Sequence, residues 1–259
     1  MYIIECIKKV DPFFGRTGLT IGNFEGFHKG HIAIIQTLVK ETRKRGLFSA
    51  VITFKQHPLK VLGSGEPEKL WAPMDKINSF KKAGIDLLVY IDFSTKFSGT
   101  MPVDFLAHLN EVMKPELYCL GGSFRFGKNN SGDMELLKRV SSRFNYRLIS
   151  VRDVMCRGAP VSSTRIRSAV KSGNFGLVEE LLGRRYSVYL TTDACNSTSM
   201  LPFITNCAVP CNGSFSGELE YLRTKENRKQ RLIVSHHRFQ SKQKGEFKNG
   251  GLYKFSFFK

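Results

Sequence analysis

Two histidines separated by two residues lie in a glycine-rich stretch near the start of the chain. Residues 21–31 read Ile-Gly-Asn-Phe-Glu-Gly-Phe-His-Lys-Gly-His, so His28 and His31 are three positions apart. If a helix has begun there, the two imidazoles share one of its faces. Glycine lets a backbone approach a ligand closely, and the first N–H groups of a helix attract an anion. The stretch therefore predicts a phosphate site with two imidazoles, with a glycine-rich turn and solvated histidines as the alternative.

Two arginines follow a run of hydroxyl side chains later in the chain, where residues 161–167 read Val-Ser-Ser-Thr-Arg-Ile-Arg. Serine and threonine are good helix N-caps, which would explain them without any ligand. Arg165 and Arg167, however, would oppose the helix dipole in a first turn. We therefore expect an anion close to this segment.

A third stretch, residues 121–133, follows an apolar run and is also rich in glycine. Residues 122–128 match the first seven positions of a P-loop, G-x-x-x-x-G-K. The eighth should be a serine or threonine that binds magnesium, and it is Asn129. Because Phe124 and Phe126 would also crowd a loop that wraps phosphate, we do not assign a P-loop here.

The segments around these motifs alternate between strand-like and helix-like patterns. Apolar runs predict strands at 19–21, 48–54, 87–91, 117–120 and 146–151. Helical spacing predicts helices at about 32–45, 76–83, 102–113 and 133–144. Such alternation is typical of an α/β fold with a doubly wound parallel sheet, in which ligands bind at the carboxyl ends of the strands.

Residues 22–31 resemble the G-x-F-D-G-x-H-x-G-H signature of the nucleotidylyltransferase superfamily. The chain is similar in particular to the adenylyltransferase module of the bacterial bifunctional riboflavin kinase/FMN adenylyltransferases. Residues 53–58 resemble that family's T-F-x-P-H-P segment, which lies against the flavin. Residues 121–132 resemble its G-x-(N/D)-F-x-F-G-x-x-x-x-G segment, and residues 161–167 its I-S-S-T-x-I-R motif.

The resemblance implies a Rossmann-like sheet of nucleotidylyltransferase type that transfers AMP from ATP to FMN, giving FAD and pyrophosphate, with Mg²⁺ arriving on ATP. It implies three catalytic residues, which are His28, His31 and Arg167. The nucleotide-binding residues that it implies are Gly22, Asn23, Phe24, Glu25, Gly26, His28, Gly30, His31, Gly121, Ser123, Ser162, Ser163, Thr164 and Arg167. Those that it implies for flavin are Phe54, Gln56, His57, Pro58, Leu62 and Phe126.

Departures from the family pattern include three polar positions. Glu25 stands where the family has aspartate, Ser123 where it has asparagine or aspartate, and Gln56 where it has proline. A carboxylate moved by one methylene can cost about 100-fold in rate. The departures at Glu25 and Ser123 therefore leave open a slower or altered enzyme.

The resemblance covers about residues 17–186 and ends at Leu-Gly-Arg-Arg-Tyr, which is similar to the family's module boundary. We therefore expect an adenylyltransferase domain at 1–186 and a small β-rich domain at 187–259. The second part lacks the G-F-P-T-A-N segment of the family's kinase module, so we expect a reduced remnant without riboflavin kinase activity. Short strand patterns occur there at 213–222, 231–235 and 252–258.

Cysteine usage and hydropathy indicate a cytosolic protein. The six cysteines lack framework spacing, as expected of free thiols, and no apolar run reaches the roughly 20 residues of a membrane span. A zinc site is the alternative for Cys207 and Cys211, with Cys195 upstream and His236 and His237 downstream.

The formal charge of +18 suits anionic partners such as ATP and FMN. The excess of Lys and Arg is spread over both expected domains, whereas a nucleic-acid binder more often concentrates it. Two alternatives nevertheless stay open. One is a related adenylyl- or cytidylyltransferase with another phosphate acceptor, and the other is a nucleic-acid-binding protein on the same scaffold.

Overall fold

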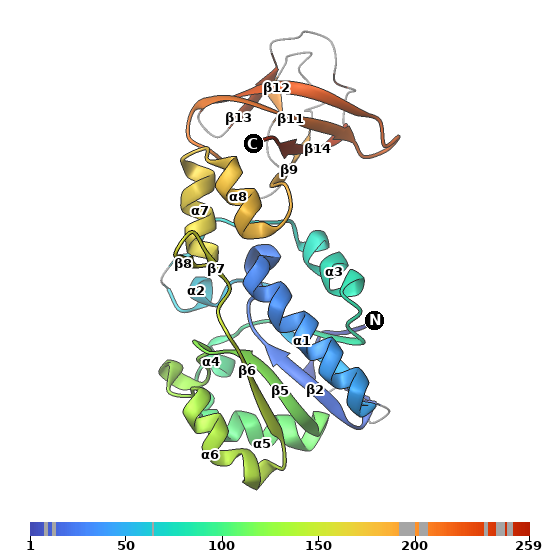
Figure 1. Cartoon of the computed structure of the whole chain (residues 1–259), viewed down its shortest axis with the longest axis vertical. Coiled ribbons are helices and arrows are strands. Elements are labelled where there is room, and N and C mark those ends of the chain that lie inside the picture. Colours follow the sequence, from blue (N-terminus) through green and yellow to red (C-terminus); the bar gives the residue numbers. More distant parts are fainter. Residues whose placement is uncertain are drawn as a thin grey trace. The chain divides into compact units, whose positions relative to one another are not determined.

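The computed structural model describes residues 1–7, 10–11, 14–63, 65–191, 200–201, 207–235, 238–241, 247 and 251–259 (Figure 1). The chain forms two compact units. The first comprises Met1–Pro67 and Lys76–Val154, and the second comprises Glu68–Asp75 and Met155–Lys259. This structural division differs from the module boundary expected at Tyr186, which stays a prediction about functional modules.

A six-stranded parallel sheet forms the centre of the first unit. Its strands are β1 (Tyr2–Ile4), β2 (Thr17–Ile21), β3 (Phe48–Phe54), β4 (Leu87–Ile91), β5 (Pro115–Gly121) and β6 (Arg147–Val151). They pair in the order β1-β4-β3-β2-β5-β6, and every pair is parallel. The chain leaves β2 for β3 and β4 on one side and later returns to β5 on the other. Sheets of this kind bind ligands at such a switch point, beyond the carboxyl ends of the strands.

Helices cover both faces of this sheet, which confirms the predicted fold class. The helices of this unit are α1 (Lys29–Arg45), α2 (Pro58–Val61), α4 (Thr95–Ser98), α5 (Pro102–Met113), α6 (Met134–Phe144) and most of α3 (Pro73–Lys82), whose first three residues belong to the second unit. Buried Leu106 and Leu109 of α5 share one core cluster with Leu19 of β2. On the other face Gly18 lies directly against Leu38 and Thr42 of α1, which leaves no room for a side chain at position 18.

Two helices and an antiparallel sheet form the second unit. The helices are α7 (Ser163–Lys171) and α8 (Phe175–Leu182), preceded by a hairpin of β7 (Met155–Cys156) and β8 (Ala159–Pro160). The sheet order is β10-β13-β12-β11-β14-β9. Its strands are β9 (Ser187–Thr191), β10 (Met200–Leu201), β11 (Gly213–Tyr221), β12 (Asn227–Ser235), β13 (Arg238–Ser241) and β14 (Leu252–Phe257). The predicted β-rich C-terminal part is therefore confirmed.

Aromatic packing explains why α8 belongs with this sheet. The Phe175 ring of α8 stacks on Phe257 of β14 with 4.0 Å between centroids, and it meets Phe215 of β11 edge-on. Tyr186 is buried, and its hydroxyl donates to the carbonyl of Ala208 at 2.7 Å. Residues on both sides of Tyr186 thus share one core.

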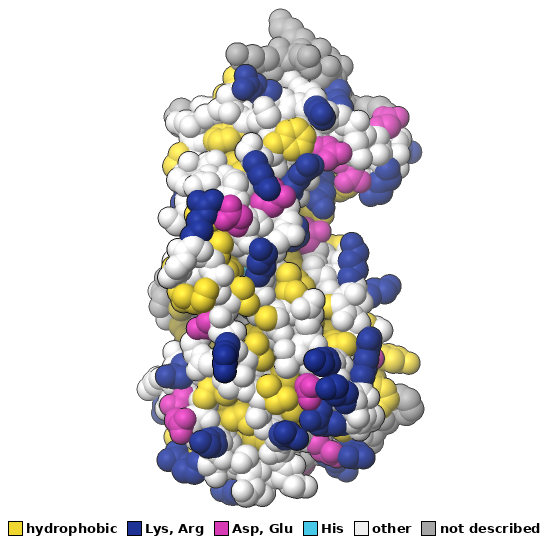
Figure 2. Space-filling view, viewed as in Figure 1, with side chains coloured by type: hydrophobic (Ala, Val, Ile, Leu, Met, Phe, Trp, Pro, Cys, Tyr) yellow, Lys and Arg dark blue, Asp and Glu magenta, His cyan; other side chains and the backbone are white. Residues whose placement is uncertain are grey.

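Lys and Arg side chains are scattered over the face of the molecule shown in Figure 2, with Asp and Glu among them. Several of the acidic groups pair with basic neighbours, as Glu41 does with Arg45 one helical turn away. None of the helices in the described part of the chain is long and apolar enough to cross a bilayer.

Candidate active site

The histidine motif forms the junction between β2 and α1. His28 is the N-cap of α1, and its Nδ1 accepts a hydrogen bond from the backbone N–H of His31 at 3.4 Å. The two imidazole rings stack with 3.6 Å between centroids and 17° between planes. The structure therefore confirms that both side chains share one face at the start of a helix, where N–H groups attract an anion.

The loop before the helix adopts a backbone that residues with side chains rarely take. Phe24 and Phe27 have φ values of 50° and 44°, and Gly26 lies between them at 75°. Both phenylalanines are buried edge-on against Phe80, and the Phe24 ring also packs on His31. Such conformations persist only where packing holds them, and they cluster at functional sites.

Burial keeps both imidazoles neutral in the free protein. It lowers the pKa of His28 from 6.5 to about 4. The pKa of His31 is lowered well below 6.5, mainly by burial and further by the electrostatic effects of His28 and Lys76. The His31 Nδ1 atom is buried, and among the described residues it has no hydrogen-bond partner. A phosphate oxygen would supply that partner and favour the protonated ring.

The shifted pKa predicts a loss of stability in mild acid. Between pH 6.5 and 4 the unfolded chain binds a proton at His28 that the folded protein does not. The free energy of unfolding should thus fall over this range, by up to about 3 kcal/mol from this group. Urea unfolding at pH 7 and pH 4.5 tests this with His28→Asn, which should lose less stability than the parent. Equal losses in the two proteins would refute the assignment.

A largely apolar cavity of about 540 Å³ lies in the first unit at the carboxyl ends of its strands. Six phenylalanines line it, which are Phe54, Phe93, Phe97, Phe105, Phe124 and Phe126. They form a continuous series of ring contacts from Phe93 through Phe54 and Phe97 to Phe105, and on to the stacked pair Phe126 and Phe124. Such walls suit a flat aromatic ligand.

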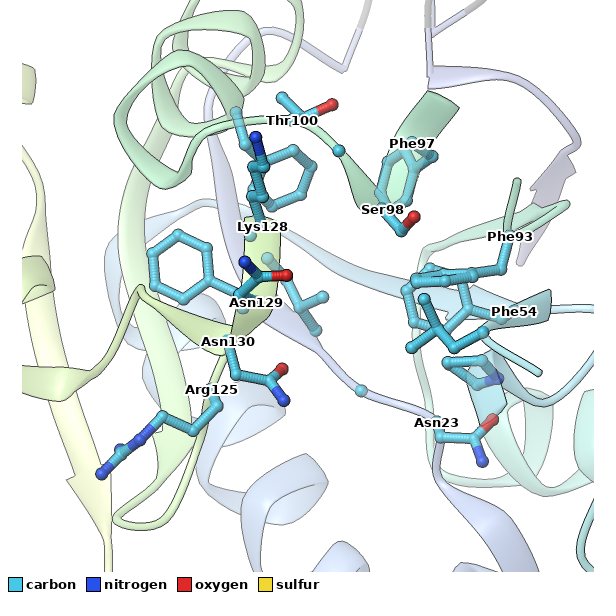
Figure 3. Close-up of a pocket in the computed structure, with 18 of the residues that line it drawn as sticks. Asn23, Phe54, Phe93, Phe97, Ser98, Thr100, Arg125, Lys128, Asn129 and Asn130 are labelled. Atoms are coloured by element: carbon cyan, nitrogen blue, oxygen red, sulfur yellow. The ribbon is translucent and has the colours of Figure 1, made fainter. Parts of the chain in front are cut away.

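Polar groups interrupt these walls at a few places (Figure 3). Asn23 follows β2, Ser98 is the last residue of α4, and Thr100 follows that helix. Lys128, Asn129 and Asn130 come from the short 3-10 helix η4 (Lys128–Asn130). Sequence reasoning missed Phe93, Phe97 and the residues of α4. Their place in the sequence, just after the predicted strand at 87–91, could have identified them, because ligands bind beyond the carboxyl ends of strands in such sheets.

Four of the residues predicted to contact flavin line this cavity, namely Phe54, Pro58, Leu62 and Phe126. Gln56 and His57 do not. The Gln56 amide donates to the carbonyl of Phe93, and His57 is the N-cap of α2, where its Nδ1 accepts from the N–H of Leu59.

The residues of the first unit that were predicted to bind the nucleotide lie at several different places. Gly22 and Asn23 line the cavity. Gly121 ends β5, whereas Ser123 is exposed in the turn that follows, and neither lines the cavity. Phe24, Glu25 and Gly26 belong to the loop between β2 and α1 (residues 22–28, the histidine loop), and Gly30 lies in the first turn of α1.

From the sequence, no P-loop was assigned to residues 122–128, and the structure agrees. Residues Lys128–Asn130 form η4, and α6 begins only at Met134, with Asp133 as its N-cap. Phe126 and Gly132 pair with each other across this loop. The backbone therefore builds a cavity wall here instead of wrapping a phosphate.

Replacement of Gly127 by alanine is expected to lower the stability of the fold. Its φ is 72° and its ψ is −177°, and a Cβ atom there would lie 2.6 Å from Cγ of Pro102. We expect Gly127→Ala to lower the free energy of unfolding by about 2–3 kcal/mol, measured by urea unfolding. Gly99→Ala is the control, because Gly99 also lines the cavity but has φ −79° and no atom closer than 3.6 Å. Equal costs for the two variants would contradict this account.

The hydroxyl–arginine motif lies in the second unit, at the start of α7. Ser162 is the N-cap and accepts from the N–H of Arg165 at 3.3 Å, while Ser163 and Thr164 form the first turn. The guanidinium of Arg165 donates to the carbonyls of Cys156 and Ala159 at 2.8 and 2.9 Å. Arg165 therefore holds the β7–β8 hairpin.

Arg167 is the arginine of this motif that stays available for an anion. Its Nε donates to the carbonyl of Glu68 at 2.7 Å, which fixes the guanidinium. The Glu68 carboxylate pairs with Lys171 instead, at 2.8 Å. Within the described ranges, Arg167 forms no ion pair with a carboxylate.

The described residues contain no group of three or more His, Cys, Asp or Glu side chains that could hold a metal ion. The zinc alternative falls largely outside them, because Cys195, His236 and His237 are not among the described residues. Cys207 is buried and Cys211 is exposed, and both are free thiols.

A family model described as FAD synthetase matches residues 12–165. The bifunctional riboflavin kinase/FMN adenylyltransferase of Escherichia coli K12 is 31% identical over 172 residues, 66% of this chain and 55% of that protein. The chain thus spans about half the length of such bifunctional relatives. The FAD synthetase of Listeria monocytogenes is 27% identical over 213 residues, 81% of this chain and 84% of that protein.

A crystal structure described as a macrolide-efflux protein from Streptococcus pneumoniae has the same fold. Its TM-score is 0.85 at 23% identity, over 98% of this chain and 88% of that one. The family model covers more than half of the chain and includes the histidine loop and most of the cavity wall. The chain belongs to the FAD synthetase family.

Proposed function

We propose that this chain transfers AMP from ATP to FMN, forming FAD and pyrophosphate. One observation carries the proposal. The loop after β2 lines the phenylalanine-walled cavity with Gly22 and Asn23 and then presents the stacked His28 and His31 at the start of α1. A flat aromatic acceptor and a phosphate chain would therefore meet at a single loop.

The chemistry needs positioned anions rather than a side-chain nucleophile. A phosphate oxygen of FMN attacks the α-phosphorus of ATP, a new O–P bond forms, and the bond from the α-phosphorus to the bridging oxygen breaks. Pyrophosphate leaves with the electron pair of that bond. An FMN phosphate is already ionised near pH 7, so no general base is required. The protein contributes orientation and charge stabilisation.

We assign the chain's own groups as follows. His28 and His31 donate ring N–H groups to phosphate oxygens of the transferring region. Arg167 and the N–H groups at Ser163 and Thr164, at the start of α7, hold the β- and γ-phosphates. Gly121 and Ser123 are proposed to contact the nucleotide.

We propose that Mg²⁺ arrives with ATP. Phosphate oxygens are the hard ligands that Mg²⁺ prefers, and the ion supplies positive charge to the triphosphate. In this proposal ATP and FMN are the partners, and the enzyme acts in the cytoplasm. The scattered Lys and Arg side chains support small anions as partners over nucleic acid.

The proposed modules are the adenylyltransferase at 1–186 and a reduced β-rich remnant at 187–259 without riboflavin kinase activity. Support comes from the sequence of the second part, which contains no G-F-P-T-A-N segment.

The purified chain, incubated with ATP and Mg²⁺ and separately with FMN or riboflavin, tests the proposal by chromatography of the flavins. We expect FAD from FMN and no product from riboflavin. Failure to form FAD would overturn the proposed transfer. Formation of FMN from riboflavin would overturn the proposed lack of kinase activity.

A further inference from the structure

Gln56 departs from the family pattern, and the structure shows a specific contact for its side chain. It stands where a proline is usual, and it was expected to contact the flavin directly. Its side chain does not line the cavity. The amide Nε2 donates instead to the backbone carbonyl of Phe93 at 3.1 Å, in a half-buried position.

This hydrogen bond extends the link between two strands beyond the end of the sheet. Lys55 donates its backbone N–H to the carbonyl of Ile91 at 2.9 Å, where β4 ends. Phe93 lies two positions further on, outside the strand. The Gln56 side chain thus reaches a backbone carbonyl beyond the strand pairing, and a proline side chain has no donor for this purpose.

Phe93 is part of a three-ring wall of the cavity. Its ring meets Phe54 edge-on at 5.1 Å between centroids and Phe97 at 5.5 Å, and Phe54 and Phe97 lie 5.9 Å apart. All three side chains line the cavity and appear on the same side of it in Figure 3. Because each ring packs on the other two, a shift of Phe93 changes the surface that all three present.

We propose that Gln56 is a positioning residue that holds Phe93 in the cavity wall and thereby sets the affinity for the flavin acceptor. This inference rests on the proposed function of the cavity as the FMN site. Loss of one such hydrogen bond should weaken FMN binding about three- to tenfold. The chemical step should be unaffected, because the hydrogen bond that is lost lies at Phe93 in the cavity wall and not at the histidine pair.

Equilibrium binding of FMN without ATP, monitored by the quenching of flavin fluorescence, tests this directly. Gln56→Met keeps the length of the side chain and removes its donor. The matched control is Lys55→Met, whose Nζ pairs with Asp92 and Glu5 at exposed positions and also links the ends of β3 and β4. We expect a three- to tenfold rise in Kd for Gln56→Met and no change for Lys55→Met.

A double variant tests whether Gln56 acts on FMN binding through Phe93 and not through a general loss of stability. Phe93→Leu should also weaken FMN binding, and the double variant with Gln56→Met should bind no more weakly than Phe93→Leu alone. In turnover, Gln56→Met should raise KM for FMN and leave kcat and KM for ATP unchanged. Additive effects, or parental affinity of Gln56→Met, would overturn the inference.

The two proposals fail in different ways. A parent protein that binds FMN but forms no FAD would overturn the proposed transfer, while the binding series would still decide the role of Gln56. A parent protein that does not bind FMN would overturn both.

Discussion

His28→Asn is expected to lower kcat for FAD formation by about 100- to 1000-fold, the usual cost of removing a donor that stabilises transition-state charge. Asparagine is a good N-cap, so the backbone N–H of His31 keeps an acceptor and α1 keeps its start. The variant loses the second ring nitrogen, Nε2, and the stack on His31. Steady-state kinetics with FMN and ATP measure the effect.

FMN binding should survive this substitution, because His28 does not line the cavity. His108→Asn is the matched control, since His108 lies on α5 and is partly exposed beside Glu111. Its kcat should equal that of the parent. A His28→Asn protein that folds and turns over within about threefold of the parent would contradict the assigned role of His28.

Arg167→Ala is expected to lower kcat/KM for ATP by about 100-fold, because it removes a charged donor from the triphosphate. The guanidinium is held in place by its Nε bond to Glu68, so little of it has to be ordered when ATP binds. Arg167→Lys should recover only part of the loss, since an ammonium cannot reproduce the planar fork. The kinetics of ATP at saturating FMN provide the measurement.

Arg165→Ala tests whether the loss of any positive charge in this helical turn weakens ATP binding, or only the loss of Arg167. Arg165 donates to two carbonyls of the β7–β8 hairpin, so its loss should cost about 1–3 kcal/mol in the free energy of unfolding. KM for ATP should stay within a few-fold of the parent value. If the two alanine variants lost ATP affinity equally, the division of roles between Arg165 and Arg167 would be wrong.

Much of the α/β unit follows from periodicity in the sequence. The predicted strands at 48–54 and 87–91 match β3 and β4, and the predicted helix at 102–113 matches α5. Buried parallel strands are short apolar runs, and the helices between them repeat at helical spacing, so both signals are local. The helix after the histidine motif begins earlier than predicted, at Lys29, because the His28 side chain caps it.

The cavity could be predicted only in part, because its walls come from segments far apart in the chain. Phe54 and Phe126 belong to segments that resemble family motifs, whereas Phe93 and Phe97 follow β4 without any motif. The use of Gln56 could not be predicted either, since its partner is a backbone carbonyl 37 positions away. Contacts of this kind leave no periodic signal in the sequence.

The roles of Arg165 and Arg167 show the same limit. Their helix position predicts an anion, but only the structure shows that carbonyls of a hairpin already occupy Arg165. The division after Val154 also had no local signal, since contacts within the second unit, such as Phe175 on Phe257, join residues far apart in the chain.

Transfer of label from α-phosphorus-labelled ATP to FMN is the measurement that tests the central claim most directly. The account predicts that the label appears in FAD and that the released pyrophosphate carries none, because the bond between the α- and β-phosphates breaks. Label that stays in ATP would contradict it, and so would a labelled flavin product from a parallel reaction with γ-phosphorus-labelled ATP.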